Sequence, residues 1–243
     1  MRIAILSDMH SNFAALQAVL RHADSGGSAD AVWCLGDIVG YGAEISATIA
    51  ALRGRPLTSV AGNHDLAATG AISVEDFNPV AAEAALWTAE QLSSDERAFL
   101  LDLPLTMVTG AFTLVHGSLR EPMWEYLLDP EQATAQFALQ TTPYSLIGHS
   151  HLLFWVEERR GGPSFYRPDD GTTIELGERR LIINPGSAGQ PRDGDPRASY
   201  VLYDEGAATI TWHRVEYDIA ATQASIRAAG LPDMLAERLA LGR

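Results

Sequence analysis

Ala61-Gly62-Asn63-His64-Asp65 follows the apolar run Leu57-Thr58-Ser59-Val60, which predicts a buried strand. A carboxamide and an imidazole therefore project from a strand end, and neither belongs in a core unless something binds it. Four further apolar runs end in the same way. They lead into Asp8 and His10, Gly36-Asp37, His116-Gly117 and Gly148-His149-Ser150-His151. Because an α/β sheet collects strand ends along one edge, where such proteins place their sites, this pattern predicts a dinuclear metal site.

The chain opens with a βαβαβ pattern, which indicates a layered α/β fold. Apolar runs predict strands over residues 2–8, 31–36 and 57–62, and apolar residues at helical spacing predict helices over 13–23 and 43–52. Ser11 or Asn12 can cap the first of these helices, and Gly26-Gly27 is expected to end it.

Residues 75–103 interrupt this alternation with two helices, from Asn78 to Leu92 and from Asp95 to Leu103. This helical insertion is either a lid or partner surface, or a pair of helices that only pack against the rest of the fold. The alternation returns with strands over 112–116 and 144–148, which are separated by a long segment with a helix from Pro130.

After residue 152 the pattern predicts antiparallel strands and two closing helices. The strands are expected over 153–158, 172–176, 181–184, 199–204 and 208–215, and the helices over 218–229 and 232–241. Gly177-Glu178-Arg179-Arg180 is a plausible hairpin turn, and a second hairpin is predicted around Glu205-Gly206. Since no shift in composition marks a linker, we expect residues 1–243 to form a single domain.

The composition of the chain indicates where the protein is located and which classes of partner it does not bind. No leader-like segment precedes the first strand, and no apolar run approaches the roughly 20 residues that span a bilayer. The only cysteine, Cys34, cannot form an intrachain disulfide. We therefore expect a soluble, cytoplasmic protein with no membrane partner. The net charge of −14 argues against non-specific binding of DNA or RNA, but bound dications would reverse the local sign of a site and admit a phosphate substrate.

The residue types at the five strand ends indicate the chemistry of the site. Manganese, iron, zinc and nickel ions accept such a mixture of imidazole, carboxylate and carboxamide ligands. Two divalent ions roughly 3.5–4 Å apart can clamp the attacking and leaving oxygens of a phosphoryl displacement. One Asp-x-His pair usually marks only a turn, but its occurrence together with Gly-Asp, Gly-Asn-His-Asp and His-x-His, each after an apolar run, favours a metal centre.

In this order the five motifs resemble those of the calcineurin-like metallophosphoesterases, over about residues 1–190. The resemblance implies a four-layer αββα sandwich of two mixed β-sheets flanked by helices, with the dinuclear site at the sheet edges. It implies that Asp8, His10, Asp37 and His151 hold one metal, and that Asp37, Asn63, His116 and His149 hold the other, with Asp37 bridging. The segment from Asn184 to Gly194 is similar to that of small bacterial and archaeal members described as phosphodiesterases.

The resemblance also implies a hydrolase that acts on small phosphate esters. In such a mechanism a metal-bound hydroxide attacks phosphorus, the metals hold the non-bridging oxygens, and His64 protonates the leaving oxygen as general acid. Asp65, its neighbour in the chain, could orient the imidazole. Protein phosphatases of the superfamily carry an arginine where this chain has Tyr41, and they end the third motif in Glu where it has Asp65. Without the bidentate guanidinium of that arginine, the dianion of a phosphomonoester loses a binding partner. The sequence therefore favours phosphodiesters over phosphomonoesters as substrates.

Several residues are candidate substrate contacts, and one of them, Asn63, also belongs to the ligand set. The others are Arg192 and Tyr41; Arg120 and Arg197 lie in comparable loops. A loop arginine can grip phosphate or be merely solvated, and a tyrosine in a glycine loop can stack on a nucleobase or, as we favour here, pack. Trp124 and Tyr126 are predicted to be core or lid contacts.

Two other functions stay open. One is a phosphomonoesterase or protein phosphatase, which the missing arginine disfavours. The other is a non-catalytic, metal-binding interaction scaffold, which stays open because a fold alone never determines function. The intact ligand set and the presence of His64 disfavour it. The sequence indicates neither the substrate, nor the native metals, nor the oligomeric state.

Overall fold

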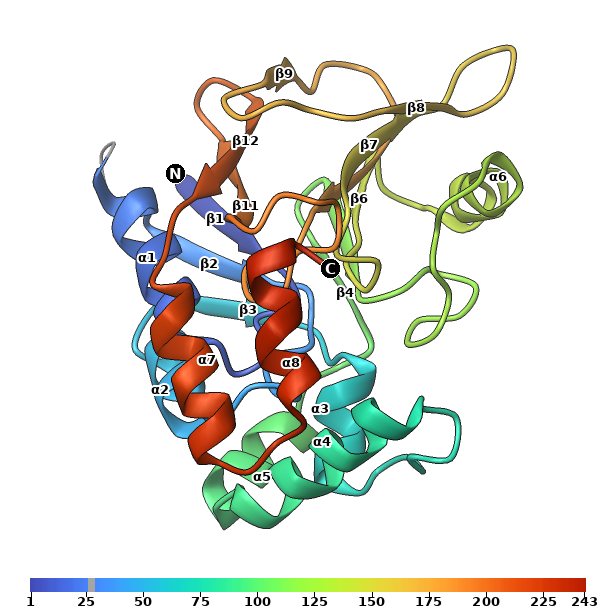
Figure 1. Cartoon of the computed structure of the whole chain (residues 1–243). Coiled ribbons are helices and arrows are strands. Elements are labelled where there is room, and N and C mark those ends of the chain that lie inside the picture. The colour runs from blue at the N-terminus through green and yellow to red at the C-terminus, as the bar shows by residue number, and fades with distance from the viewer. Residues whose placement is uncertain (26–28) are drawn as a thin grey trace.

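The computed structural model describes residues 1–25 and 29–243, and two mixed β-sheets packed face to face form its centre (Figure 1). Each sheet has six strands, in the orders β3-β2-β1-β11-β12-β9 (sheet A) and β4-β5-β6-β10-β7-β8 (sheet B). Helices flank the outer face of each sheet, so the four-layer αββα sandwich predicted from the sequence is confirmed.

Sheet A combines the opening strands with the closing hairpin. Its strands are β1 (Arg2–Leu6), β2 (Ala31–Cys34), β3 (Leu57–Ser59), β9 (Thr173–Glu175), β11 (Ala198–Asp204) and β12 (Thr209–Val215). β1, β2 and β3 run parallel, and β11 returns antiparallel beside β1. The predicted hairpin around Glu205-Gly206 is confirmed by the pairing of Asp204 with Thr209. The parallel strands therefore deliver their carboxyl ends to one edge.

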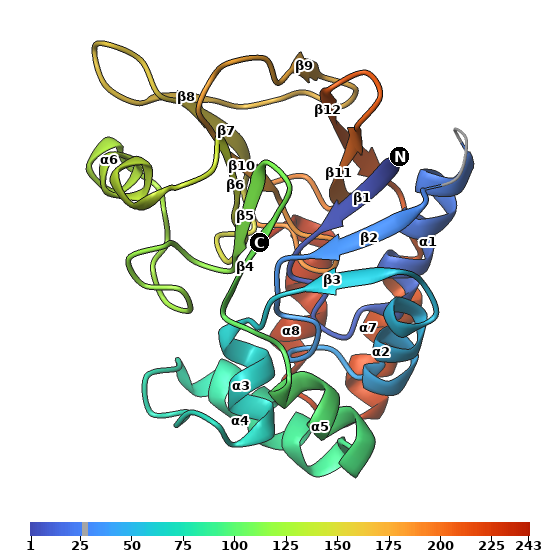
Figure 2. The same ribbon diagram turned by 180° about the vertical axis from the view of Figure 1, so that it is seen from behind.

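Sheet B has the same arrangement at its centre. Its strands are β4 (Thr106–Thr109), β5 (Phe112–Val115), β6 (Tyr144–Leu146), β7 (Leu153–Glu157), β8 (Ser164–Tyr166) and β10 (Leu181–Pro185). β5, β6 and β10 run parallel to one another, and the other pairings are antiparallel. Seen from behind, the helices after β3 lie beyond the ends of the strands of both sheets (Figure 2).

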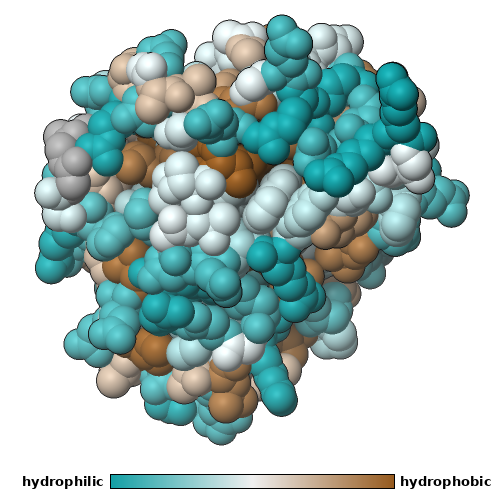
Figure 3. All heavy atoms as spheres, turned by 90° about the horizontal axis from the view of Figure 1, so that it is seen from above, coloured by the Kyte–Doolittle hydropathy of each residue, from teal (hydrophilic) through white to brown (hydrophobic). Residues whose placement is uncertain are grey.

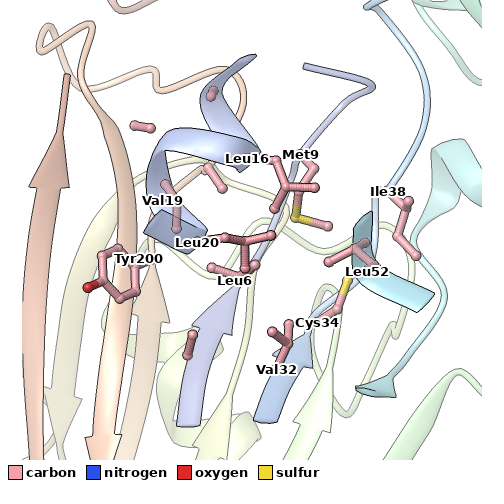
Figure 4. Packing of buried hydrophobic residues seen from close by; sticks show 14 of the residues in the cluster. Leu6, Met9, Leu16, Val19, Leu20, Val32, Cys34, Ile38, Leu52 and Tyr200 are labelled. Atoms are coloured by element: carbon pink, nitrogen blue, oxygen red, sulfur yellow. The ribbon is translucent and has the colours of Figure 1, made fainter. Parts of the chain in front are cut away.

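The alternation of side chains along β1 explains the layers. Ile3 and Ile5 pack between the two sheets, whereas Ala4 and Leu6 face the helices, as expected when a strand is buried on both sides. Figure 4 shows the helix side of sheet A, where Leu6 lies among the side chains of α1 (Phe13–Ser25). Fully burying one such aliphatic side chain stabilises the fold by about 1.5–3 kcal/mol.

The remaining helices cover the outer faces and the site edge. They are α2 (Ile45–Arg53), α3 (Asn63–Thr69), α4 (Pro79–Gln91), α5 (Ser94–Leu101), α6 (Pro130–Leu139), α7 (Ile219–Ala228), α8 (Asp233–Glu237) and the 3₁₀ helix η1 (Arg238–Leu241). α2 joins α1 over sheet A, and α6 covers sheet B. Among the helices of the described residues, none is long and apolar enough to cross a membrane.

The helical insertion has the two helices that the sequence predicts. Asn78 caps α4 by accepting from the backbone N–H of Ala81, and Ser93 and Glu96 form a capping box at the start of α5. Ala81 and Ala84 of α4 pack against the C-terminal helices.

The structure differs from the sequence-based expectations at three places. The third strand, expected over 57–62, ends at Ser59, and the residues Asn63 and His64 that follow it open helix α3. Residues 177–180 are not a hairpin, because β9 belongs to sheet A and β10 to sheet B. The short strands β4 and β8 were not predicted, since three- and four-residue strands carry little periodicity. The predicted helix end at Gly26-Gly27 lies outside the described residues.

The surface seen from above, from the side of β8 and β9, is mainly hydrophilic (Figure 3). Apolar atoms show mostly in recesses between polar side chains on this face. The face therefore lacks the broad apolar patch that marks a large protein interface.

Candidate metal centre

All seven predicted metal ligands meet at the joint edge of the two sheets, and all are buried. Sheet A contributes Asp8, His10, Asp37 and Asn63, and sheet B contributes His116, His149 and His151. Six of them form two groups whose ligand atoms lie within 4.8 Å of one another: Asp8, His10 and His151, and Asp37, His116 and His149. The strand-end pattern thus brings together the residues that it predicts.

In the first group, backbone carbonyls decide which imidazole nitrogen is free. His10 Nδ1 lies 3.1 Å from the carbonyl oxygen of Val39, and His151 Nδ1 lies 2.5 Å from that of Gln190. A carbonyl only accepts, so both Nδ1 atoms carry the proton and both Nε2 atoms present a lone pair. These Nε2 atoms are 3.2 Å apart, and Asp8 Oδ1 lies 3.3 Å from that of His151. Lone pairs and a carboxylate oxygen that face one another at these distances repel, and a cation between them would turn this repulsion into attraction.

In the second group, too, a backbone carbonyl faces one nitrogen of each imidazole. His116 Nδ1 lies 2.7 Å from the carbonyl oxygen of Leu35, and His149 Nε2 lies 3.3 Å from that of Trp124. The other two nitrogens, His116 Nε2 and His149 Nδ1, face each other at 3.1 Å. Asn63 lines the same pocket as His149, and its Oδ1 is buried without a hydrogen-bond partner. An orphaned buried carbonyl oxygen of this kind suits a metal.

Asp37 lies between the two groups. Its Oδ2 is 3.6 Å from His10 Nε2 and 3.3 Å from His116 Nε2, while its Oδ1 accepts from the backbone N–H of His64 at 2.9 Å. One carboxylate oxygen thus faces both ligand groups, as a bridging ligand requires.

The charges of the site are strongly coupled. Burial by itself would raise the pKa of Asp37, but the neighbouring His116 and His64 hold this pKa well below its ordinary value. Burial would lower the pKa of His116, but the Asp37 carboxylate raises it to about 9. Burial raises the pKa of Asp8 to about 7. In the metal-free chain a proton on His116 therefore balances Asp37, and a cation could take the place of this proton.

The backbone is strained at the ligands. Seven residues of the site stretches have positive φ without being glycine: Asp8, His10, Ser11, Asp37, Tyr41, His149 and His151. Each such conformation costs of the order of 1–3 kcal/mol and persists only where the surrounding structure enforces it. Gly62 also allows close approach, since a Cβ there would lie 2.1 Å from Asp37 Oδ1. The strain is concentrated where the ligands converge.

His64 lies in the wall of this centre. Its ring centroid is 4.9 Å from that of His10 and 4.4 Å from that of Tyr41, and its Nδ1 is buried without a partner. A third group of possible ligands joins it with His10 and Asp37 within 4.8 Å. Burial lowers the pKa of His64 to about 4. At neutral pH His64 is therefore an uncharged imidazole that faces the pocket.

Asp65 does not orient His64. Its Oδ1 accepts from the backbone N–H of Val39 and its Oδ2 from that of Gly62, each at 3.0 Å. The carboxylate therefore caps α3 and ties it to the loop after β2, which corrects the sequence-based expectation.

A pocket of about 130 Å³ opens on the centre, between Asp37, Asn63, His64, His149 and His151. Four aromatic side chains also line it: Tyr41, Phe77, Trp124 and Tyr126. The Tyr126 ring stacks on His149 at 4.0 Å between centroids, and Phe77 meets Trp124 at 5.2 Å. Trp124 and Tyr126, predicted as core or lid contacts, thus line the pocket. Phe77 was missed, and its only signal was its place just before the cap of α4.

The three loop arginines differ in their partners and in whether they reach the pocket. Arg192 lines the pocket, with its guanidinium carbon 5.8 Å from the centroid of the Tyr41 ring. Arg120 forms an ion pair with Glu125, and Arg197 forms one with Asp195. Of the three, only Arg192 remains a candidate contact of substrate. The predicted packing of Tyr41 is confirmed by its burial against the rings of His10 and His64.

Two adjoining groups of metal-type side chains therefore lie at the common edge of an αββα sandwich, with Asp37 of one group 3.6 Å from His10 of the other. The chain belongs to the calcineurin-like phosphoesterase superfamily, whose domain matches residues 1–207. This confirms the family that the five motifs predict.

Individual relatives span the full length of the chain. It is 38% identical to an uncharacterised protein of Methanocaldococcus jannaschii over 99% of this chain and 98% of that protein. It is similar to the crystal structure of a metallophosphoesterase from Sphaerobacter thermophilus, with 45% identity, a TM-score of 0.91 and coverage of 100% and 99% of the two chains. A hypothetical protein from Pyrococcus horikoshii shares the fold, with 20% identity, a TM-score of 0.81 and coverage of 100% and 98%.

Proposed function

We propose that this protein is a phosphodiesterase that works with two divalent cations. The main supporting observation is the pair of adjoining ligand groups, in each of which two imidazole nitrogens lie only 3.2 or 3.1 Å apart, with Asp37 facing both groups. Membership of a superfamily of phosphoesterases supports a hydrolase, and the ligand groups support metal dependence. Neither observation by itself selects a substrate.

The residues present fit two metal ions. Asp8, His10, Asp37 and His151 would hold one ion, and Asp37, Asn63, His116 and His149 the other. Mixed nitrogen and oxygen ligands suit manganese, iron, zinc or nickel. When bound, such a pair of ions polarises the phosphoryl oxygens and lowers the pKa of water. The backbone carbonyls behind the imidazoles hold each ring in the tautomer that this requires.

The role proposed for His64 is to give a proton to the leaving oxygen. Its imidazole faces the pocket beside the ligands, and the backbone N–H of the same residue is bonded to Asp37. Because burial lowers the pKa of His64 to about 4, the free site holds this side chain neutral. A phosphate anion in the pocket would raise this pKa, so we expect His64 to take up its proton together with the substrate.

The pocket walls favour diesters. A phosphodiester carries an organic group on each side of phosphorus, and aromatic side chains come from two separate loops. Phe77 precedes α4, and Trp124 and Tyr126 precede α6. These rings offer apolar or stacking contact to both ester groups.

Arg192 supports a second candidate function, the hydrolysis of monoesters. The sequence suggested diesters because Tyr41 stands where monoester-specific relatives keep an arginine. In the structure another segment brings an arginine onto the Tyr41 ring. Its guanidinium could bind the additional charge of a monoester dianion.

A matched pair of p-nitrophenyl substrates tests the proposal. The metal-replete protein should hydrolyse the bis-ester with a higher kcat/KM than the mono-ester, and chelation should abolish both activities. A preference for the mono-ester of about tenfold, or ~1.4 kcal/mol in transition-state free energy, would select the second candidate. Absence of any hydrolysis by the metal-loaded protein would leave the interaction scaffold as the better interpretation.

A further inference from the structure

Two arginines from different segments approach the ring of Tyr41. The guanidinium carbon of Arg192 lies 5.8 Å from the ring centroid, and that of Arg238 lies 5.9 Å from it. Arg192 follows β10, and Arg238 opens η1 near the C-terminus. Cation–π contacts of this kind hold both cations against one ring that also borders the metal centre.

Neither guanidinium forms an ion pair with an aspartate or glutamate side chain among the described residues. Arg192 donates to the side-chain oxygen of Gln190, and its Nε is buried with no partner. Arg238 donates from its Nε to the main-chain oxygen of Arg243, the last residue of the sequence. By contrast, Arg55 pairs with Asp24 and Arg214 with Asp193 in this acidic chain. Two arginines that contact the same ring without an acidic side chain as partner offer donors to an anion.

The charge of Arg192 also acts on Arg238. Burial, followed by the charge of Arg192, lowers the pKa of the Arg238 guanidinium below its ordinary value. Acidic side chains also line these recesses, Asp76 near Arg192 and Glu237 near Arg238, but neither forms an ion pair with them. An incoming anion would relieve this repulsion and satisfy guanidinium donors that the fold leaves free.

The place of the pair relative to the metal centre suggests what the anion is. Tyr41 and Asn78 line both the pocket over the ligands and an adjoining recess of about 420 Å³, which Arg238 borders. A group bound there would be the neighbour of a phosphoryl group bound at the metal centre. The pair therefore fits a second phosphate of the same substrate molecule.

We propose that Arg192 and Arg238, held on Tyr41, form a subsite for a second phosphate group adjacent to the reacting one. This inference rests on the proposed function, and it narrows the substrate class to esters that carry neighbouring phosphates, as nucleoside polyphosphates do. Arg238 lies beyond residue 207, where the match to the family domain ends. The subsite therefore joins Tyr41 and Arg192 of the shared domain to an arginine of the C-terminal segment that follows it.

Calorimetric titration of the metal-loaded protein at buffered free Mn²⁺ tests the subsite without requiring turnover. Adenosine diphosphate should bind about tenfold more tightly than adenosine monophosphate, because only the diphosphate can span both positions. Arg238→Gln should remove most of this difference. Arg238→Lys should retain part of it, since the charge remains. Arg21→Gln, which removes the same charge from an exposed position on α1, should leave the difference intact.

Pyrophosphate and orthophosphate, titrated in parallel, identify the source of recognition. A similar preference for pyrophosphate supports a subsite that reads phosphates alone, whether they come from a nucleotide or an inorganic chain. A preference for the diphosphate that survives Arg238→Gln, or no preference in the wild-type protein, overturns the proposal. A melting curve of each variant confirms that it is folded.

Kinetics separates this proposal from the proposed function. In Arg238→Gln the ratio of kcat/KM for a dinucleoside polyphosphate to that for bis-p-nitrophenyl phosphate should fall about tenfold, through KM. If no ester is hydrolysed but the diphosphate preference depends on Arg238, the phosphodiesterase assignment fails and the subsite stands. If both esters are hydrolysed and the ratio is unchanged, the subsite fails and the phosphodiesterase assignment stands.

Discussion

The Nε2 atoms of His10 and His151 lie 3.2 Å apart, although 141 residues separate the two histidines in the chain. Each ring donates its other N–H to a backbone carbonyl, so neither Nε2 can donate to the other. Burial also lowers the pKa of both histidines well below its ordinary value, which keeps the rings uncharged. The contact is therefore unfavourable in the metal-free chain and becomes favourable once a cation lies between the rings.

Removal of metal should destabilise the fold. A ligand present at about 1,000 times its dissociation constant stabilises the native state by about 4 kcal/mol, if it binds only that state. We expect the melting temperature to fall after chelation and to recover when Mn²⁺ or Zn²⁺ is added back, as measured by scanning calorimetry. Equal melting temperatures with and without metal would contradict a site whose ligand imidazoles need a cation between them.

Asp37 should control both metal positions. Asp37→Asn keeps the shape of the side chain but removes the charge between the two groups, so metal content should fall from about two equivalents to well under one. His10→Ala removes a ligand of one group and should chiefly lower the content by one ion. Elemental analysis of the dialysed proteins measures this. Asp30→Asn, at an exposed carboxylate just before β2 and at the opposite end of that strand from Asp37, is the control. An Asp37→Asn protein with full metal content would refute the shared ligand.

His64 should matter most for poor leaving groups. A positioned acid contributes about 10²–10⁴-fold to rate, and a basic alkoxide needs the proton far more than p-nitrophenolate does. His64→Asn should keep its metal content and lose much more activity on an alkyl or nucleoside diester than on a p-nitrophenyl diester. The measurement is kcat/KM on both substrates, together with metal analysis.

Two outcomes would reject the acid role of His64. Equal losses on both substrates with metal retained would make His64 a phosphate contact. Loss of metal would make it a ligand, as its proximity to His10 and Asp37 allows.

Arg97 should anchor the helix that carries Asn63 and His64. Its guanidinium donates to the carbonyl oxygens of Ala68 and Thr69 at the end of α3, and to that of Ala89 in α4. Hydrogen bonds to a charged group contribute about 1.5–3 kcal/mol, so Arg97→Gln should lower the free energy of unfolding by about 2 kcal/mol in urea titrations.

The matched control for Arg97 is Arg53→Gln. This arginine forms an exposed ion pair with Asp95 and should cost less than about 1 kcal/mol. Similar losses in the two variants would show that the contacts of Arg97 with the helix ends add nothing beyond an ordinary surface pair.

The sequence by itself determined a layered α/β fold and the residues that gather at the candidate site. Both are local signals: the continuous apolar run from Ile3 to Leu6 is typical of a strand with two covered faces, and the residue types after each strand are those that metals bind. Parallel strands place their ends at one edge, so Asp8, Asp37 and His116 were expected to meet before their distances were known.

Only the tertiary structure decided the details that give the site its chemistry. It placed Asn63 and His64 on a helix, turned Asp65 into a cap, and set a carbonyl behind each ligand imidazole. It also brought Arg192 and Arg238 to Tyr41. These contacts join segments far apart in the chain, so they depend on packing between layers, whereas periodicity and residue type report only on a segment and its nearest neighbours.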